Sequence, residues 1–495
     1  MQMKRSLLII ALVAASTLGA AAQSTLQQRI TNDIKRASAL KGAGVAVAVK
    51  DAKGNTLVAV NADQRLVPAS NLKLITTGTA LHKLGQNYKF KTTLGYTGNI
   101  EDGTLNGDLY IIGGGDPTVG AKDSLVTNPA AQFARWKAIM DKAGIKRING
   151  RIIGDSRAWE GYLEFGDWTY EDVGTFYGAG SGALCFYKNA IDLKVAAGAA
   201  EGDPVQAAQS YPETPWMHFT NSAVTGKAGT GNSLFLYTTD LAPYSELRGS
   251  FALDRKPKTE HYANKFGALT CAQYFLYYLK AVGVEVACGA ADIDRSGYLR
   301  GTDMVPAEKA GDPVQIGCAD SPTLADIVKE TNFESDNFYA EAIFRTMGEE
   351  ATGYAVYDSA RVAEKSVLKK LGLNPEEPTI MDGSGLSRRN AVSARFMVDY
   401  LYAMTSSMAF PAFLASIPAP GQGTVKTLLN NNGSKGRFRL KSGSMEGVLC
   451  YSGYLLGDDG TPVASVSVLV NASTAKTAQI RKALEPLFED ILLYL

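Results

Sequence analysis

Histidine is scarce in this sequence, with three residues among 495. His82, His218 and His261 do not occur in H-E-x-x-H or in another spacing typical of metal ligands. A Ser-His-Asp triad is not excluded by this count alone, but no G-x-S-x-G motif in a strand-to-helix setting accompanies the histidines. We therefore expect no histidine-based metal centre, and we look for a catalytic base of another residue type.

The sequence also lacks a strong charge of either sign. It contains 50 basic and 49 acidic residues, which leaves a net charge of +1. This balance gives no electrostatic reason to expect binding to nucleic acid or to an anionic membrane surface. We predict no nucleic-acid partner, and any charged substrate must be recognised by local groups.

Long apolar runs are absent beyond the first two dozen residues. No later segment has about 18 consecutive apolar residues, so no transmembrane anchor is predicted. The N-terminus has the parts of a secretory signal: Lys4 and Arg5, the apolar run 7–15, and Ala20-Ala21-Ala22. We predict a signal peptide of residues 1–22, with a buried first helix as the alternative. The mature protein is then expected to be exported, in the periplasm or associated with the cell envelope.

The five cysteines lack the C-x-x-C spacing of structural zinc sites and thioredoxin-like centres. An odd number leaves at least one thiol free, and the sequence does not indicate a disulfide pairing. We assign the cysteines no function and predict no metal or organic cofactor.

Two β-rich regions lie at opposite ends of the chain. Residues 44–49 and 57–60 flank turn residues at 51–55, which predicts a β-hairpin. Three further strands are predicted at 437–442, 448–456 and 463–470, followed by a largely apolar helix at 474–494. Together they predict one antiparallel sheet that is covered by helices and built from both ends of the chain.

The region between these ends has a different pattern of predicted secondary structure, with short strands, Gly-rich turns and few helices. Two helices, at 130–143 and 267–281, each lead into a Gly-apolar pair, which suggests an internal duplication. We therefore predict a catalytic domain that is interrupted by a long insertion. The predicted division is a signal peptide at 1–22, a first catalytic part at 23–88, an inserted accessory region at 89–310 and a second catalytic part at 311–495.

Lysine can act as the base when histidine does not, and the motif that pairs it with a serine is S-x-x-K. On a helix, residues i and i+3 share a face, so the amine can reach the hydroxyl. Ser70 and Lys73 stand out because they follow Leu66-Val67-Pro68-Ala69 and open an apolar helix, whose N-terminus favours developing negative charge. The alternative for Ser70 is a simple helix N-cap. The motif occurs four times, the others starting at Ser38, Ser366 and Ser473.

Two further motifs occur once each: Ser335-Asp336-Asn337 and Lys441-Ser442-Gly443. Alone, Ser335 could be an N-cap and Lys441 an ordinary edge-strand lysine. The order S-x-x-K, S-D-N, K-[ST]-G is typical of β-lactamases and penicillin-binding proteins. The three motifs together therefore indicate a serine acyl-transfer enzyme.

The sequence resembles a family, the class C low-molecular-mass penicillin-binding proteins, which are D-Ala-D-Ala carboxypeptidases and endopeptidases. The resemblance spans nearly the whole mature chain, including a long insertion between Ser70 and Ser335. One departure is Ser442, where threonine is common, but the hydroxyl is kept. The resemblance also rests on Gly115-Asp116-Pro117, Gly154-Asp155-Ser156, Asp382-Gly383-Ser384-Gly385-Leu386-Ser387-Arg388 and Ser452-Gly453-Tyr454.

The resemblance implies an α+β fold. Its core is a serine β-lactamase/transpeptidase-like domain, an antiparallel sheet flanked by helices, with a large inserted accessory region rich in β structure. It also implies the substrates, which are peptidoglycan stem peptides, and it implies that β-lactam antibiotics bind as covalent inhibitors.

The resemblance further implies a role for each motif residue. Ser70 is the expected nucleophile, and Lys73 accepts its proton. The backbone N–H groups of Ser70 and Ser444 are expected to form the oxyanion hole. The other expected roles are proton relay to the leaving amine for Ser335, orientation of the substrate and Lys73 for Asn337, and carboxylate binding or support of the proton network for Lys441, Ser442 and Gly443.

Two further substrate contacts are predicted outside the motifs. Asp155 is a candidate contact for a cationic group of the stem peptide, with an ordinary turn aspartate as the alternative. Arg388 is a candidate contact for a substrate carboxylate, with a structural salt bridge as the alternative.

Three other functions stay open at this point. A β-lactamase shares the acylation step, but no acidic deacylation motif is evident and the large insertion argues against it. A non-catalytic peptidoglycan-binding protein would not need a nucleophile with a base, whereas an esterase or amidase on the same scaffold is not excluded by motifs. The sequence does not indicate the balance of carboxypeptidase to endopeptidase activity, the third stem-peptide residue or the oligomeric state.

Overall fold

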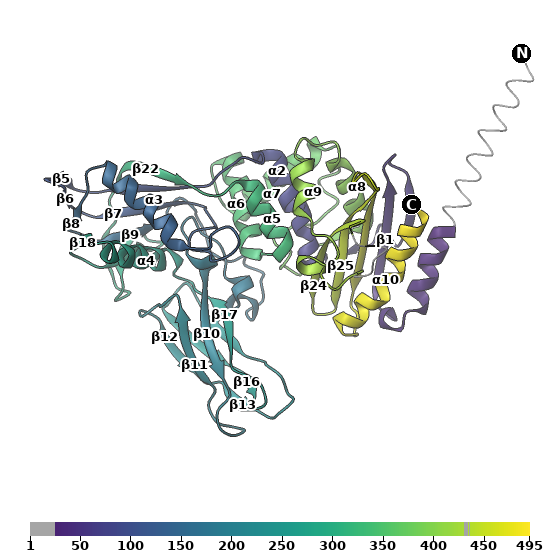
Figure 1. Ribbon diagram of the computed structural model, residues 1–495, viewed down its shortest axis with the longest axis horizontal. Coiled ribbons are helices and arrows are strands. Elements are labelled where there is room, and N and C mark those ends of the chain that lie inside the picture. The colour runs from purple at the N-terminus through teal and green to yellow at the C-terminus, as the bar shows by residue number, and fades with distance from the viewer. Residues whose placement is uncertain (1–24, 430–433, 435) are drawn as a thin grey trace, which may run out of the picture. The chain divides into compact units, whose positions relative to one another are not determined.

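The computed structural model describes residues 25–429, 434 and 436–495 (Figure 1). The predicted signal peptide, residues 1–22, lies outside the described residues. The chain forms two compact units. The first contains the described residues up to Lys83, Thr331–Ser335 and the described part of Glu364–Leu495; the second contains Leu84–Glu330 and Asp336–Ala363.

The first unit is built around a five-stranded antiparallel sheet with the order β2-β1-β26-β25-β24. Two strands come from the start of the chain and three from its end, as predicted, and among the described residues none from 89–310 joins them. β1 pairs with β26 along its whole length, from Gly44 with Asn471 to Asp51 with Ala464. The strands are β1 (Gly44–Asp51), β2 (Thr56–Val60), β24 (Phe438–Met445), β25 (Val448–Leu456) and β26 (Pro462–Asn471).

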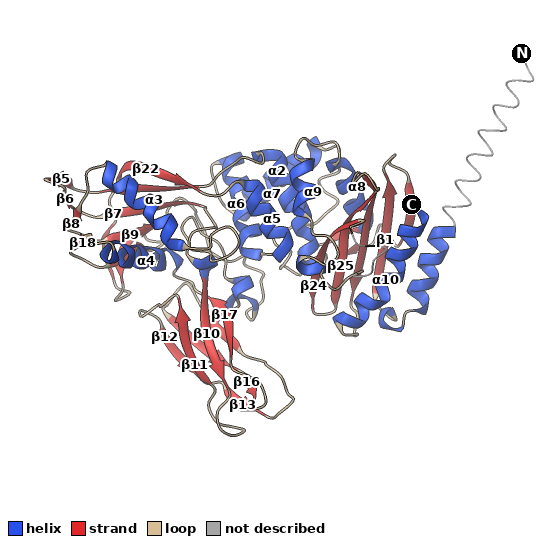
Figure 2. Ribbon diagram, in the orientation of Figure 1, coloured by secondary structure: helices blue, strands red, loops and turns tan. Residues whose placement is uncertain are grey.

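Helices cover both faces of this sheet (Figure 2). β25 is buried at every position because it lies between two helical layers. The helix of residues 25–36 and α10 (Thr477–Tyr494) pack on one face, where Leu26, Val47 and Phe488 share a core. α8 (Ala394–Met404) packs against β1 and β26 and contacts α2 (Lys73–Leu84) through the Tyr400 hydroxyl, which donates to the Leu74 carbonyl at 3.1 Å. The remaining elements are η1 (Ser38–Leu40), η2 (Ala69–Leu72), α9 (Phe410–Ser416), η6 (Gly423–Val425) and the short pair β3 (Arg65–Leu66) and β23 (Val392–Ser393).

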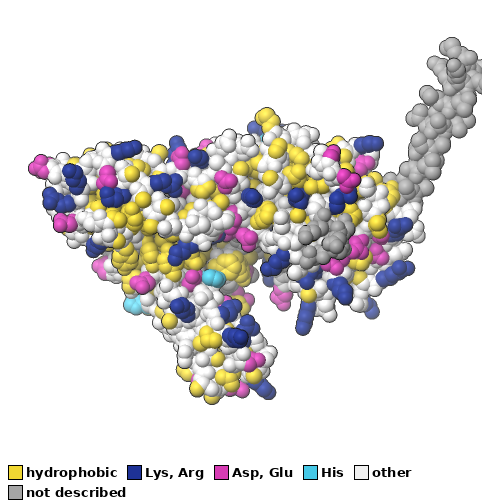
Figure 3. All heavy atoms as spheres, viewed as in Figure 1, with side chains coloured by type: hydrophobic (Ala, Val, Ile, Leu, Met, Phe, Trp, Pro, Cys, Tyr) yellow, Lys and Arg dark blue, Asp and Glu magenta, His cyan; other side chains and the backbone are white. Residues whose placement is uncertain are grey.

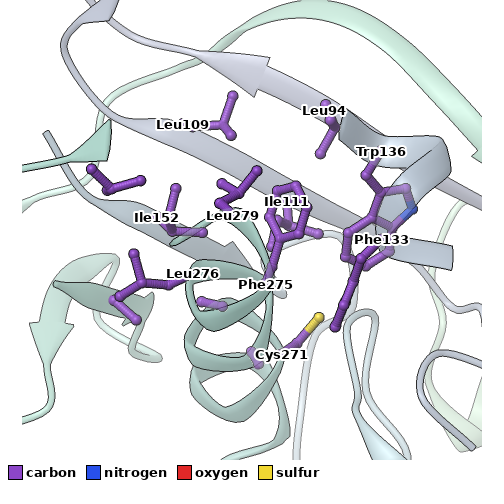
Figure 4. Packing of buried hydrophobic residues seen from close by; sticks show 14 of the residues in the cluster. Leu94, Leu109, Ile111, Phe133, Trp136, Ile152, Cys271, Phe275, Leu276 and Leu279 are labelled. Carbon is purple, nitrogen blue, oxygen red and sulfur yellow. The ribbon is translucent and has the colours of Figure 1, made fainter. Parts of the chain in front are cut away.

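The second unit contains a seven-stranded mixed sheet with the order β21-β20-β19-β9-β7-β4-β22. Its core is made by this sheet and two helices, α3 (Pro129–Lys142) and α4 (Gly267–Ala281), whose aromatic side chains interlock (Figure 4). The ring centroid of Trp136 lies 5.3 Å from that of Phe133 and 5.4 Å from that of Phe275. The strands are β4 (Lys91–Tyr96), β7 (Leu109–Gly114), β9 (Ile152–Asp155), β19 (Ala290–Ile293), β20 (Tyr298–Gly301), β21 (Pro306–Lys309) and β22 (Val314–Asp320).

The two helices noted in the sequence begin matching substructures. α3 leads into β8 (Arg147–Ile148) and then β9, and α4 leads into β18 (Glu285–Val286) and then β19. β8 pairs with β18 and β9 pairs with β19, both in parallel. This arrangement is what the suggested internal duplication would produce. β5 (Asn99–Glu101) and β6 (Thr104–Asn106) complete the sheet of β8 and β18.

Small sheets fill the region between the two repeats. One has the order β11-β10-β17, another β12-β15-β14, and β13 pairs with β16. The strands are β10 (Ala190–Ala196), β11 (Gln206–Tyr211), β12 (His218–Asn221), β13 (Val224–Gly226), β14 (Phe235–Thr238), β15 (Tyr244–Arg248), β16 (Ser250–Ala252) and β17 (Lys258–Ala263). Single 3-10 turns lie at η3 (Asp172–Gly174) and η4 (Phe176–Gly178). Three helices follow these strands in the chain: α5 (Leu324–Glu334), α6 (Asn337–Thr352) and α7 (Tyr357–Lys370).

β22 belongs to the second compact unit. β22 pairs antiparallel with β4, from Val314 with Tyr96 to Asp320 with Lys91. Residues 311–330 therefore group with the second unit, and the inserted region at 89–310 stays a prediction. Residues 336–363 group with it too, so the chain passes between the units at the Ser-Asp-Asn motif.

The surface agrees with the balanced composition. On the face shown in Figure 3, Lys and Arg side chains are interspersed with Asp and Glu. Among the described residues, no helix has both the length and the apolar composition needed to cross a membrane.

Candidate active site

Ser70 lies in η2, immediately before α2 begins at Lys73. The segment enters this turn through Ala69, whose φ of 47° is in the left-handed region, and the Asn71 N–H donates to the Pro68 carbonyl at 3.2 Å. Ser70 itself is partly exposed, whereas Ala69 and Asn71 beside it are buried. The turn therefore presents the Ser70 hydroxyl to solvent from a rigid, buried support.

Lys73 lies one turn along the helix and is fully buried. Its Nζ donates to Ser70 Oγ at 3.0 Å and to the Ser384 carbonyl oxygen at 2.8 Å. This is the distance at which a serine proton can pass to an amine. Ser70 and Lys73, the first predicted pair, are therefore in hydrogen-bond contact.

A loop that begins at Asp382 supplies the second contact of Lys73. The buried carboxylate of Asp382 accepts from the backbone N–H groups of Gly385 at 2.9 Å and Ser387 at 2.6 Å, and from the Asn390 amide at 2.8 Å. Gly385 has a φ of 85°, and a Cβ there would lie 2.0 Å from the Ala69 carbonyl oxygen. The loop is therefore held closely against the turn that carries Ser70.

Lys441 on β24 is the second fully buried lysine of the first unit. Its Nζ donates to Ser335 Oγ at 2.8 Å and to the Ser442 carbonyl oxygen at 2.6 Å. Burial, and then the positive charge of Lys73, hold the pKa of Lys441 well below its usual range. A lysine with a depressed pKa gives up its proton more readily than an exposed lysine.

Ser335 directly follows α5, which ends at Glu334. Its φ of 60° is in the left-handed region, which is uncommon for a residue other than glycine. Near the end of α5, the buried Asn332 amide donates to Thr77 Oγ1 at 3.1 Å and to Ser416 Oγ at 2.9 Å. These bonds fix the C-terminus of α5 against α2 and α9, and so they help to place Ser335.

β24 is an edge strand of the five-stranded sheet and packs closely against η2. A Cβ at Gly443 would lie 2.4 Å from the Pro68 carbonyl oxygen, so only glycine fits there. The buried amide of Asn71 donates to the Lys441 carbonyl at 2.6 Å and accepts from the Ser452 N–H at 3.2 Å. Beside them, Ser442 Oγ donates to Thr424 Oγ1 at 2.7 Å.

The backbone of β24 leaves alternate N–H groups on its open side. The Leu440 N–H donates to the Pro418 carbonyl outside the sheet, and the Ser442 carbonyl accepts from the Lys441 side chain. Because backbone groups of alternate residues in a strand face the same side, the Ser444 N–H also faces away from β25. This orientation is the one that an oxyanion donor on an edge strand needs.

The other predicted residues lie in different surroundings. Asn337 belongs to the second unit, where its amide donates to the Tyr177 carbonyl at 3.0 Å. Asp155, also in that unit, is buried and accepts from Arg157 Nη2 at 2.8 Å. Arg388 is exposed on the loop that begins at Asp382. The structure therefore brings together Ser70, Lys73, Ser335, Lys441, Ser442 and Gly443, and it gives Asp155 an ion-pair partner of its own.

Four contributors to this site were not predicted as site residues: Asn71, Asn332, Ser384 and Thr424. Ser384 contributes its backbone carbonyl, a group that every residue has, so its residue type does not mark it as a site residue. The Asp382-Gly383-Ser384-Gly385 stretch was the available signal, because an aspartate followed by glycines is typical of a tight turn.

Comparisons with known proteins identify the family of this chain. The family model described as the D-Ala-D-Ala carboxypeptidase 3 (S13) family matches residues 26–490. The D-alanyl-D-alanine carboxypeptidase of Actinomadura sp. (strain R39) is 30% identical over 451 residues, covering 86% of this chain and 78% of the relative. The D-alanyl-D-alanine carboxypeptidase DacB of Haemophilus influenzae is 24% identical over 461 residues, covering 88% and 87%.

A solved structure supports the same fold. The crystal structure of penicillin binding protein 4 from Haemophilus influenzae has a TM-score of 0.78 at 20% identity, and the match covers 94% of this chain and 99% of that one. The family model alone spans most of the chain and all three motifs. The chain therefore belongs to the D-Ala-D-Ala carboxypeptidase 3 (S13) family.

Proposed function

We propose that this enzyme cleaves D-Ala-D-Ala termini and D-alanyl cross-links of peptidoglycan with Ser70 as its nucleophile. The observation that carries the proposal is the pair of short contacts in the first unit. Lys73 Nζ lies 3.0 Å from Ser70 Oγ, and Lys441 Nζ lies 2.8 Å from Ser335 Oγ. One pair suits removal of a proton from the nucleophile, and the other suits delivery of a proton to the leaving group.

Acylation begins when Ser70 Oγ bonds to the carbonyl carbon between the two D-alanines and its proton passes to Lys73 Nζ. The carbon–nitrogen bond then breaks, and the leaving amine takes the proton of the Ser335 hydroxyl. Lys441 replaces that proton across their hydrogen bond. Lys73 then releases the proton that it accepted, and Lys441 regains one from solvent. In deacylation, the oxygen of a water molecule bonds to the ester carbon while Lys73 takes one of its protons. The bond between that carbon and Ser70 Oγ then breaks, Lys73 returns the proton to Ser70 Oγ, and the acid product leaves.

The tetrahedral intermediates carry a negative oxygen, for which we propose the backbone N–H groups of Ser70 and Ser444. The helix N-terminus at Ser70 and the open edge of β24 support this assignment. Each such donor typically contributes about 10² to 10³ in rate.

We propose that the edge of β24 also binds the terminal carboxylate of the substrate. Ser442 offers a hydroxyl next to Lys441 in the chain, and that hydroxyl would turn its proton from Thr424 Oγ1 to the carboxylate when the substrate binds. Hydrogen bonds of charged groups to a carboxylate are stronger than those between neutral groups. We retain Asn337 as the group that orients the substrate, while Asp155 and Arg388 stay predicted contacts.

We further propose that β-lactams acylate Ser70 and that the protein is exported after removal of residues 1–22. A solved structure of penicillin binding protein 4 from Haemophilus influenzae is complexed with a β-lactam. Mass spectrometry of the mature N-terminus tests the export proposal: the expected first residue is Gln23, and a retained Met1 in envelope-localised protein would contradict it.

Release of D-alanine from a peptide that ends in D-Ala-D-Ala tests the reaction. The wild-type enzyme should release the terminal D-alanine, and Ser70→Ala should release none. Ser38→Ala, a matched serine from another S-x-x-K, should behave as wild type. Release by Ser70→Ala would overturn the assignment, and no release by the wild type would favour a binding protein.

A further inference from the structure

Lys188 lies in the second unit just before β10, and its ammonium bridges two carboxylates. Its Nζ is 2.8 Å from Asp336 Oδ2 and 2.8 Å from Asp123 Oδ2. The Tyr339 hydroxyl donates to Asp123, and the Tyr339 ring centroid lies 4.5 Å from the same ammonium. The three charged side chains are only 21%, 14% and 10% exposed for Lys188, Asp336 and Asp123. The bridge is therefore a largely buried ionic group and not a surface pair.

The charges of Lys188 and Asp123 stabilise each other. Burial disfavours the ammonium of Lys188, but the charges of Asp336 and Asp123 outweigh burial and raise its pKa. Burial likewise opposes ionisation of Asp123, but Lys188 and the Tyr339 hydroxyl lower its pKa. Removing Lys188 would leave two buried carboxylates without their cation.

Asp336 is the central residue of the Ser-Asp-Asn motif, and both of its carboxylate oxygens are used. Oδ1 accepts from the Tyr339 N–H at 2.9 Å and so caps α6. Oδ2 accepts from Lys188. One carboxylate thus fixes the start of α6 and also receives the bridging ammonium.

The residues on each side of Asp336 are the predicted functional groups of the motif. Ser335 has a left-handed backbone, which is unfavourable for a residue with a side chain. Asn337 donates its amide to the Tyr177 carbonyl. Lys441 and the end of α5 hold Ser335 on one side, so on the other side its orientation depends on how firmly its neighbour Asp336 is held.

The turn that carries Lys188 is itself strained. Tyr187, Lys188 and Asn189 have φ values of 52°, 54° and 50°, so three consecutive residues with side chains are left-handed. The flanking side chains anchor the turn: the Tyr187 hydroxyl donates to Asp192 at 3.1 Å, and the Asn189 amide donates to the Gly180 carbonyl at 3.1 Å. Such strain persists only where surrounding contacts over-determine it, and it clusters at functional sites.

We infer that Lys188 is a positioning residue for catalysis: through Asp336 it fixes the direction in which the Ser-Asp-Asn motif presents Ser335 and Asn337. This inference rests on the proposed function, in which Ser335 passes a proton to the leaving amine. A residue that acts in this way affects substrates unequally. An amine must be protonated to leave, whereas a thiolate, with a thiol pKa of about 8.5, leaves without a proton.

The test compares kcat/KM for a D-Ala-D-Ala peptide with that for a thioester analogue, in the full-length protein. Lys188→Met should lower the amide constant about 10- to 100-fold, the scale of effect of a small misplacement, and lower the thioester constant much less. The ratio of the two constants is the readout, because a loss of folded protein reduces both equally. Lys265→Met is the matched control, since Lys265 is a buried, ion-paired lysine of the same unit whose partner is Glu164.

Ser335→Ala distinguishes the proposed role of Ser335 from the positioning role of Lys188. If Ser335→Ala leaves the amide-to-thioester ratio at the wild-type value, the proposed role of Ser335 fails. If Ser335→Ala lowers the ratio and Lys188→Met does not, the positioning role of Lys188 fails. A ratio lowered equally by Lys265→Met would also overturn it, because any buried lysine of the unit would then have the effect.

Asp336→Asn tests the positioning role of Lys188 if Lys188→Met does not fold. Its amide oxygen can still accept from the Tyr339 N–H and cap α6, but its bond to Lys188 loses the charge. We expect the same fall in the ratio. The double variant Lys188→Met/Asp336→Asn should fall no further than either single variant, and additive falls would show that Lys188 does not act through Asp336.

Discussion

Gly443 is the position at which one added methyl group should have a large and specific effect. A Cβ at residue 443 would lie 2.4 Å from the Pro68 carbonyl oxygen and 2.7 Å from the Asn71 nitrogen. Both are backbone atoms of the segment that carries Ser70, so neither can rotate away. Carbon–oxygen contacts of this kind are normally no closer than about 3.3 Å, so β24 and η2 would have to separate by roughly 1 Å.

We expect Gly443→Ala to slow acylation of Ser70 by a β-lactam about 10²-fold, because a displacement of 1 Å between reacting groups can have that effect. The same overpacking should lower the free energy of unfolding by about 1–3 kcal/mol. The first quantity is the second-order rate constant of covalent labelling, and the second comes from urea unfolding. Both must change if the contact between β24 and η2 aligns the site.

Gly44→Ala is the matched control. Gly44 begins β1 of the same sheet, and its added Cβ would meet nothing closer than Leu66 Cδ2 at 3.5 Å. We expect its labelling rate to equal that of the wild type. Its free energy of unfolding should be unchanged or higher by about 0.4–1 kcal/mol. Wild-type labelling of Gly443→Ala, or an equal loss in Gly44→Ala, would refute the packing argument.

Three other predictions concern the buried polar groups of the site. Lys73→Ala should slow labelling by about 10² to 10⁴, as expected for loss of a general base, whereas a rate equal to that of the wild type would remove Lys73 from that role. The pKa of Lys441 is depressed in the folded protein, so the unfolded chain binds more protons than the folded chain at pH values between the depressed and the ordinary pKa. In that range the contribution of Lys441 to the free energy of unfolding therefore increases as pH rises and decreases as pH falls. Lys441→Met should therefore flatten the pH dependence of urea unfolding on the acidic side of the ordinary lysine pKa of about 10.4, and an unchanged slope would contradict the depressed pKa. Asp382→Ala should lower the free energy of unfolding by about 3 kcal/mol or more, since it leaves buried donors without an acceptor, and a thermal or urea midpoint equal to wild type would contradict that account of the loop.

The parts of the fold that could be predicted from the sequence are those encoded by local patterns. Alternating and continuous apolar runs marked β1 and the three C-terminal strands, and turn residues at 51–55 marked the hairpin. The pairing of β22 with β4 could not be predicted in this way. Val314, Ile316 and Cys318 alternate along β22, but the strand is largely exposed or half-buried and its partner β4 lies far away in the sequence.

In the candidate site too, side chains within motifs could be predicted, whereas backbone contacts could not. Ser70, Lys73, Ser335 and Lys441 could be predicted because their side chains recur at a fixed spacing within motifs. The Ser384 carbonyl could not, because a backbone oxygen has no residue type. The strained turn at Lys188 gave no signal either, since a bulky Tyr-Lys-Asn sequence is not typical of left-handed backbone.

The most direct test of this enzyme's chemistry is the mass of the protein after treatment with penicillin, followed by peptide mapping. A long-lived adduct of one penicillin should map to the peptide that contains Ser70, and Ser70→Ala should carry none. An adduct on another serine would contradict the site assignment, and rapid multiple turnover of the β-lactam would contradict a carboxypeptidase in favour of a β-lactamase.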